Sequence, residues 1–143
     1  MRFPVLPIFL LVFISCNKKP QPLVIGKDIC NFCKMPFADS KFGAELITAK
    51  GKIYKFDDVG CLLKFMKTGL QTGEKTQYIF AVNYTGKPYF VEAAKAVFLS
   101  SVSLHTPMNS GVAAFESSPG TDEVLKEFPG NIYTWDLLQQ QFQ

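Results

Sequence analysis

The chain has 143 residues, of which 48% are hydrophobic and 14% aromatic, enough apolar material for one packed domain or two very small ones. Its formal net charge of +3 is too small and too dispersed to indicate nucleic-acid binding. His105 is the only histidine, so the sequence excludes a metal site built from several histidines.

The first sixteen residues have the pattern of an export signal. Residues 3–14 are an uninterrupted apolar run, too short for the roughly 20 residues that span a bilayer. Ser15 and Cys16 follow, and a small residue before a cysteine at this point resembles a lipobox, whose cysteine is acylated and becomes the mature N-terminus. We expect a signal peptide at 1–15 and a lipidated, polar tether at 16–27. An ordinary secretory signal with a chance cysteine is the alternative.

Residues 28–88 are predicted to form a first unit with the order strand, strand, helix, strand. Its predicted elements are strands at 44–49 and 53–56, a helix that starts after residue 58, and a strand at 78–84. The helix is predicted from an apolar face with helical spacing, formed by Val59, Leu62, Leu63, Met66 and Leu70. Asp57 and Asp58 precede this face and are residue types preferred at helix N-caps.

Residues 89–143 are predicted to repeat that order. The predicted elements are strands at 96–99 and 112–115, a helix opened by residues 120–122 and ended by Gly130, and a strand at 132–135. Gln139–Gln143 is predicted to be frayed. The fold class is therefore α+β, with two related ββαβ units packed together, joined near Pro88, and with Gly60 and Gly120 at matching helix starts. A single irregular domain is the alternative.

The densest group of metal-binding residue types is Cys30-Asn31-Phe32-Cys33-Lys34-Met35, which precedes the first strand. Two thiols and a thioether are soft donors, and soft donors select Cu(I) among the metals available to an exported protein. A structural zinc site requires four Cys or His ligands, and the sequence shows no second pair. A structural disulfide between Cys30 and Cys33 and a redox-active CxxC pair are the alternatives.

A second candidate ligand group is His105-Thr106-Pro107-Met108, which places an imidazole and a thioether three residues apart in a loop. The alternative interpretation is a solvent-facing His105 and a Met108 that fills the junction between the units. Cys61 is interpreted as a small buried apolar residue, and the two aspartates as helix caps rather than acid–base groups.

These motifs, in this order, resemble the NosL family of copper-binding accessory lipoproteins. The resemblance includes the lipobox, Cys30-x-x-Cys33-x-Met35, Tyr54-x-Phe56-Asp57-Asp58-x-Gly60-Cys61 and Thr106-Pro107-Met108-x-Ser110-Gly111. One departure is Lys34, where the family usually has glycine; a lysine there is expected to need ordinary backbone angles, and it adds a positive charge beside the thiolates.

The resemblance implies a NosL-like fold of two ββαβ units and the function of a Cu(I) chaperone rather than an enzyme. The implied Cu(I) ligands are Cys30, Cys33, Met35 and Met108, and we add His105 as a candidate from its spacing. The implied partner is nitrous oxide reductase or its assembly transporter. The expected location is a lipid anchor on the cell envelope, facing the periplasm or the cell surface. The alternatives are general copper handling and an exported thiol–disulfide oxidoreductase.

Overall fold

The computed structural model describes residues 19–70, 73–116 and 119–142, so the predicted signal peptide and Cys16 lie outside the described residues. Its elements, in chain order, are the 3-10 helix η1 (Ser40–Phe42), β1 (Ala44–Thr48), β2 (Ile53–Phe56), α1 (Val59–Thr68), β3 (Thr76–Val82), β4 (Phe90–Glu92), the 3-10 helix η2 (Ala93–Lys95), β5 (Val97–Ser100), β6 (Val112–Phe115), α2 (Pro119–Glu127), β7 (Asn131–Thr134) and α3 (Trp135–Gln141). None of the helices in the described residues is long and apolar enough to cross a membrane.

The two units share one topology. The first sheet has the strand order β2-β1-β3-β4 and the second has β6-β5-β7, with antiparallel pairing throughout. In each unit the first strand is central, the second pairs on one side of it, and the strand after the helix pairs on the other. Gly60 and Gly120 are each the second residue of their helix. The structure therefore confirms the prediction of two related ββαβ units.

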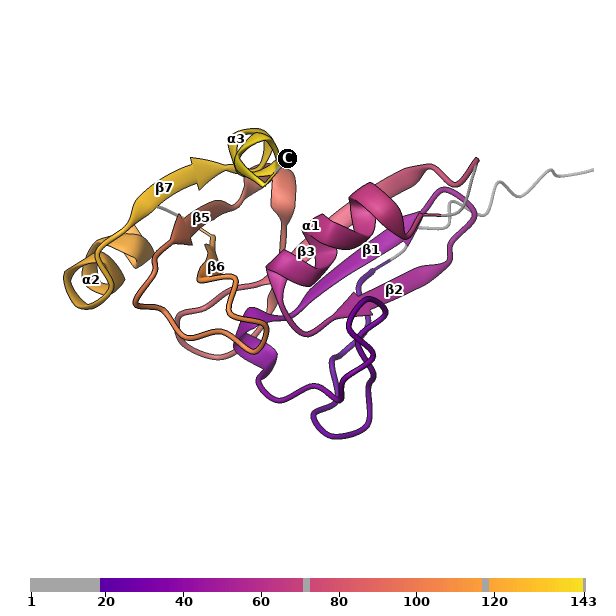
Figure 1. Ribbon diagram of the computed structural model, residues 1–143, viewed down its shortest axis with the longest axis horizontal. Coiled ribbons are helices and arrows are strands. Elements are labelled where there is room, and N and C mark those ends of the chain that lie inside the picture. Colours follow the sequence, from indigo (N-terminus) through magenta and orange to yellow (C-terminus); the bar gives the residue numbers. More distant parts are fainter. Residues whose placement is uncertain (1–18, 71–72, 117–118, 143) are drawn as a thin grey trace, which may run out of the picture.

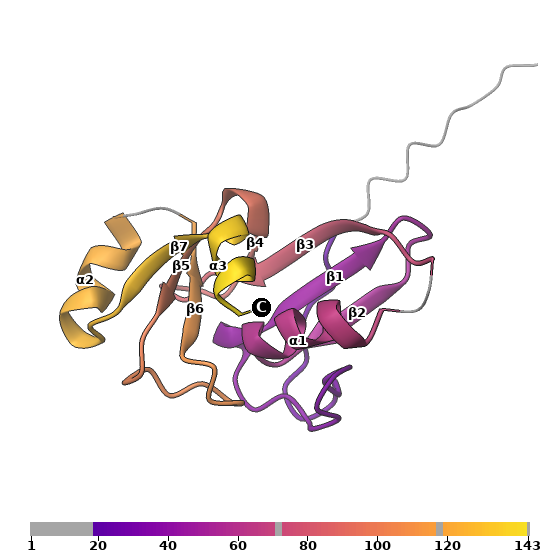
Figure 2. The ribbon, with the colours of Figure 1, turned by 45° about the horizontal axis from the view of Figure 1, so that its top comes forward.

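The units lie side by side and share a core. Figures 1 and 2 show the two sheets as neighbouring lobes, with α2 on the outer side of the second sheet and α3 at the junction. One apolar cluster contains Phe56 and Leu62 of the first unit together with Phe98 and Leu138 of the second. The backbone N–H of Tyr84 donates to the Ala114 carbonyl at 2.8 Å, which joins the end of β3 to β6.

Several predicted boundaries were wrong near the junction. The strand predicted at 78–84 is β3, which ends at Val82, because the following residues turn to pair with β6 instead. The strand predicted at 132–135 is β7, which ends at Thr134, since the Thr134 side chain caps α3. The predicted frayed end is largely helical, because α3 buries Trp135 and Leu138 in the shared core. β4 was not predicted; it extends the first sheet although it follows Pro88.

The segment before the first sheet is bound to that sheet. The Gln21 backbone N–H donates to Oε2 of Glu45 in β1 at 2.9 Å, and Nζ of Lys55 in β2 donates to the Pro22 carbonyl at 2.9 Å. Glu45 and Lys55 are cross-strand partners, so their side chains project from the same face of the sheet. Residues 21 and 22 of the expected tether are therefore in contact with the sheet.

Candidate metal centre

The CxxC segment folds back on itself in a tight loop. Ile29 and Pro36 form an antiparallel bridge, and the Cys30 N–H donates to the Met35 carbonyl at 2.9 Å. Lys34 has a φ of 65°, so the expectation of ordinary backbone angles was wrong. The turn requires a left-handed residue at this position, which costs a lysine roughly 1–2 kcal/mol compared with its preferred conformations. The Lys34 Nζ donates to the Asn31 carbonyl at 2.7 Å.

Asn31 attaches this loop to the edge of the first sheet. Its backbone N–H donates to the Lys55 carbonyl at 2.8 Å, and the Lys55 N–H donates to its Oδ1 at 2.7 Å. Lys55 also forms a salt bridge with Asp28 at 2.8 Å. These contacts place the cysteine loop beside the point where β2 ends and α1 begins.

Four side chains converge at this point. The sulfurs of Cys30, Cys33 and Cys61 and a carboxylate oxygen of Asp57 all lie within 4.8 Å of one another. Cys30, Asp57 and Cys61 are buried, and only Cys33 is partly exposed. All three cysteines are free thiols. We call these four residues the Cys3Asp cluster.

Two members of the Cys3Asp cluster were misinterpreted in the sequence. Asp58 is the N-cap of α1, as predicted, and its Oδ1 accepts from the Gly60 N–H at 2.6 Å. Asp57 does not cap the helix but contacts Cys33, whose Sγ lies 3.7 Å from Oδ1. Cys61 is buried, as predicted, but against thiols rather than only among apolar side chains. Asp57 and Cys61 are four residues apart across the start of a helix. This spacing is the feature of the sequence that could have indicated that the two side chains share a site.

Hydrogen bonds within the Cys3Asp cluster and burial shift the pKa values of its members. Hydrogen bonding from the Cys61 thiol lowers the pKa of Cys30 to about 4, and burial opposes this change. The same hydrogen bond, together with burial, raises the pKa of Cys61. Burial raises the pKa of Cys33, and burial also raises the pKa of Asp57 to about 6. Near neutral pH the cluster therefore holds the Cys30 thiolate beside the protonated thiols of Cys33 and Cys61, and a bound cation would displace the thiol protons.

A loop of the second unit closes over the start of α1. Oδ2 of Asp58 accepts from the Thr106 hydroxyl at 2.6 Å and from the Met108 N–H at 3.0 Å. A Cβ on Gly60 would lie 2.5 Å from Cβ of Ser110, so glycine is required there for the loop to approach. Met108 is half-buried and packs against the same core cluster as Cys33.

The structure thus places the predicted ligands in different environments. Cys30 and Cys33 lie together in the Cys3Asp cluster, and Met108 lies beside the helix start that carries Asp57 and Cys61. Met35 is 49% exposed, and His105 is exposed on the loop that leads to Met108. His105 does not belong to the Cys3Asp cluster.

The donor set fits a thiophilic metal ion. Three thiolates and a carboxylate match the number of ligands in a tetrahedral zinc site, although the cluster offers only three of the four Cys or His ligands that a structural zinc site uses. Soft thiolates with a thioether nearby suit Cu(I) equally well.

A reactive redox cysteine, in contrast, is accessible and has a lowered pKa. Here the accessible Cys33 has a raised pKa, and Cys30, whose pKa is lowered, is fully buried.

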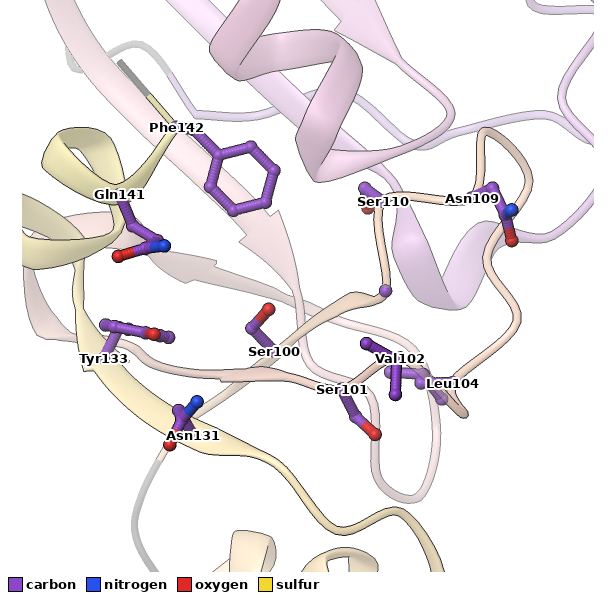
Figure 3. A pocket seen from close by; sticks show the side chains of 11 residues that line it. Ser100, Ser101, Val102, Leu104, Asn109, Ser110, Asn131, Tyr133, Gln141 and Phe142 are labelled. Atoms are coloured by element: carbon purple, nitrogen blue, oxygen red, sulfur yellow. The ribbon is translucent and has the colours of Figure 1, made fainter.

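A separate cavity of about 480 Å³ is lined by residues of the second unit, including Asn109 and Ser110, which follow Met108 in its loop. Figure 3 shows Tyr133, Gln141 and Phe142 along one side of it and Asn109 and Ser110 along the other. No residue of the Cys3Asp cluster lines this cavity, and none of its lining side chains is charged. It is therefore distinct from the candidate metal centre.

Comparison with known proteins places this arrangement in a family. The family model named NosL matches residues 23–142. The chain belongs to the NosL family. This confirms the resemblance seen in the sequence and the prediction that the chain is not an enzyme.

A solved structure supports the same fold. The crystal structure of the copper chaperone NosL from Shewanella denitrificans is similar, with a TM-score of 0.70 and 19% sequence identity over 83% of this chain and 94% of that chain. A search of curated proteins gives no match. The NosL-like fold is therefore confirmed.

Proposed function

We propose that this member of the NosL family is a copper chaperone that holds a single Cu(I) at the Cys3Asp cluster. The observation that carries the proposal is the convergence of three thiols within 4.8 Å of one another, one of them partly exposed. The description of the similar Shewanella denitrificans protein as a copper chaperone supports this proposal.

The proposed ligands are cysteine sulfurs, with methionine sulfur at the rim. Cys33 binds the ion together with Cys30 or Cys61. Met108 supports the site from the second unit, because its backbone is fixed to the residue that follows Asp57. Met35 and His105 are exposed, so they are available to hold the ion when it enters or leaves.

The placement of Cys33 explains how such a site releases its cargo. Cys30 and Cys61 are buried, so an acceptor cannot reach their sulfurs directly. Cys33 is the exception, and a donor atom from another protein can approach the ion beside it. Transfer then proceeds by ligand exchange, with no change in the oxidation state of the metal.

The proposed location and client follow from the family and from the N-terminal sequence. Acylation of Cys16 would anchor the protein to the cell envelope, facing the periplasm or the cell surface. The acceptor would be nitrous oxide reductase or the transporter that assembles it. Finding the wild-type protein wholly in the soluble periplasmic fraction, or with a mature N-terminus other than Cys16, would contradict the anchor.

A competition titration tests the metal proposal. The reduced full-length mature protein is titrated with Cu(I) against bathocuproine disulfonate, with and without Zn²⁺, and compared with Cys33→Ser. We expect the wild type to take up one equivalent of Cu(I), to retain it in the presence of Zn²⁺, and to bind it at least tenfold more tightly than the variant. Equal affinity in the two proteins, or loss of Cu(I) to Zn²⁺, would contradict the proposal.

A further inference from the structure

Exposed apolar side chains are concentrated beside the Cys3Asp cluster. Among the described residues, the large hydrophobic side chains that are exposed are Val24, Ile25, Ile29, Met35, Tyr89, Val102, Ile132 and Leu137. Half of these eight lie within residues 24–35, and each of those four is between 43% and 50% exposed. Exposed apolar side chains that gather on one surface mark an interaction site, whereas single ones spread over a protein are normal.

The segment that carries these side chains is held firmly in place. The Phe37 N–H donates to the Asp28 carbonyl at 3.1 Å, and the Gly26 N–H donates to the Phe37 carbonyl at 3.2 Å, so the segment is paired with itself. The bonds of Asn31 and Lys55 attach it to the edge of the first sheet. Figures 1 and 2 show this indigo and purple loop projecting from the body of the protein below β2. The apolar side chains are thus presented on a segment of fixed conformation, residues 24–36, which we call the platform.

This platform is continuous with the exposed side of the metal centre. Cys33 is followed by three exposed residues, Lys34, Met35 and Pro36. Pro36 is bridged to Ile29, so the apolar group reaches back from the cysteine loop to the start of the segment. During ligand exchange the ion is bonded to both proteins at once. An acceptor that reaches the ion beside Cys33 must therefore lie against Lys34–Pro36 and Ile29.

The charge on the platform indicates the kind of partner. Lys27 and Lys34 are exposed, whereas the one carboxylate of the segment, Asp28, is neutralised by its salt bridge with Lys55. The platform is therefore apolar with a positive rim. Complementary surfaces place carboxylates opposite lysines, which accelerates encounter and selects the partner.

We propose that residues 24–36 form the docking surface for the protein that exchanges Cu(I) with Cys33, and that this partner presents an apolar surface rimmed by carboxylates. This inference rests on the proposed function. It assigns the platform to a copper-exchanging protein rather than to a second copy of the chain or to a lipid surface.

The test compares copper transfer to a protein with transfer to a small chelator. Full-length mature protein in detergent, loaded with Cu(I), is mixed with copper-depleted nitrous oxide reductase or with bathocuproine disulfonate. The variant carries Ile25→Ser and Ile29→Ser, and the matched control is Ile132→Ser, an isoleucine of similar exposure in β7. We expect transfer to the reductase to be about tenfold slower in the variant than in the control, with transfer to the chelator unchanged.

Charge reversal supplies an independent test. Lys27→Glu should lower the rate of transfer to the reductase and weaken its dependence on salt, whereas Lys126→Glu, an exposed lysine in α2, should not. Equal rates of transfer to the reductase in all variants would overturn the docking proposal. The docking proposal would also be overturned if the wild type formed a dimer that the Ile25/Ile29 variant abolishes. The same holds if the unacylated wild type bound anionic vesicles and the variant did not. A wild type that binds no Cu(I) would instead refute the proposed function.

Discussion

Asp58 and Met108, fifty positions apart in the chain, are joined by a hydrogen bond of 3.0 Å from the Met108 N–H to the Asp58 carboxylate. The same carboxylate caps α1 through the Gly60 N–H and accepts from the Thr106 hydroxyl. One buried side chain therefore fixes both the start of the helix that carries Cys61 and the loop that carries Met108. It couples the two units at the edge of the candidate metal centre.

Replacing Asp58 should destabilise both units together. Asp58→Ala removes a helix cap and leaves buried donors without partners, so the free energy of unfolding in urea should fall by about 2–4 kcal/mol. Asp122→Ala, at an exposed position in the first turn of α2, should change it by no more than about 0.5 kcal/mol. Similar losses in the two variants would show that the contacts of Asp58 with the helix start and with the Met108 loop contribute little together.

Cys61 should contribute to metal binding rather than only to packing. Cys61→Ser keeps the size of the side chain but removes a soft donor, so Cu(I) affinity measured by chelator competition should fall at least tenfold. The far-ultraviolet circular dichroism spectrum should be retained. A variant that binds Cu(I) as tightly as the wild type would restore the interpretation of Cys61 as a buried apolar residue.

The sequence predicted the elements that local pattern determines. β2 and β6 have the predicted bounds, and Asp58 caps α1, because alternation, turn residues and caps act over a few positions. The roles of Asp57 and Cys61 were not predictable in this way. They depend on Asn31 pairing with Lys55, a contact across 24 residues that leaves no periodic pattern in the sequence. α3 was missed for the same reason, since Trp135 and Leu138 stabilise it through the shared core.

Glu45 should make the fold less stable as pH rises. It is fully buried in β1 and one of its oxygens has no hydrogen-bond partner. Burial raises its pKa to about 7 from the ordinary value of 4.5, while the Gln21 N–H and the Lys55 charge oppose this increase and Asp28 adds to it. The folded state therefore binds a proton that the unfolded state releases between pH 4.5 and 7, and stability falls across that window.

Glu45→Gln should remove this dependence. Relative to wild type, the variant should gain about 3 kcal/mol of unfolding free energy between pH 4.5 and pH 8, because its amide stays neutral and can still accept from Gln21. The exposed Glu123→Gln is the control. Parallel pH profiles for wild type and Glu45→Gln, measured by urea unfolding, would show that the buried carboxyl titrates normally.

Lys34 should be a source of strain in the cysteine loop. Its φ of 65° favours glycine, so Lys34→Gly should raise the free energy of unfolding by about 1 kcal/mol. Lys27→Gly is a suitable control, because Lys27 does not have a positive φ and glycine there should be neutral or slightly destabilising. A lower stability for Lys34→Gly than for Lys27→Gly would contradict the geometry of the turn.

The central claim is that cysteine sulfurs of the Cys3Asp cluster hold the copper ion. The most direct measurement is copper K-edge X-ray absorption of the Cu(I)-loaded full-length protein, beside the same protein carrying Cys33→Ser. We predict an edge characteristic of Cu(I), a first shell dominated by sulfur in the wild type, and one sulfur fewer in the variant. A first shell of nitrogen and oxygen alone, or identical spectra for the two proteins, would contradict the account.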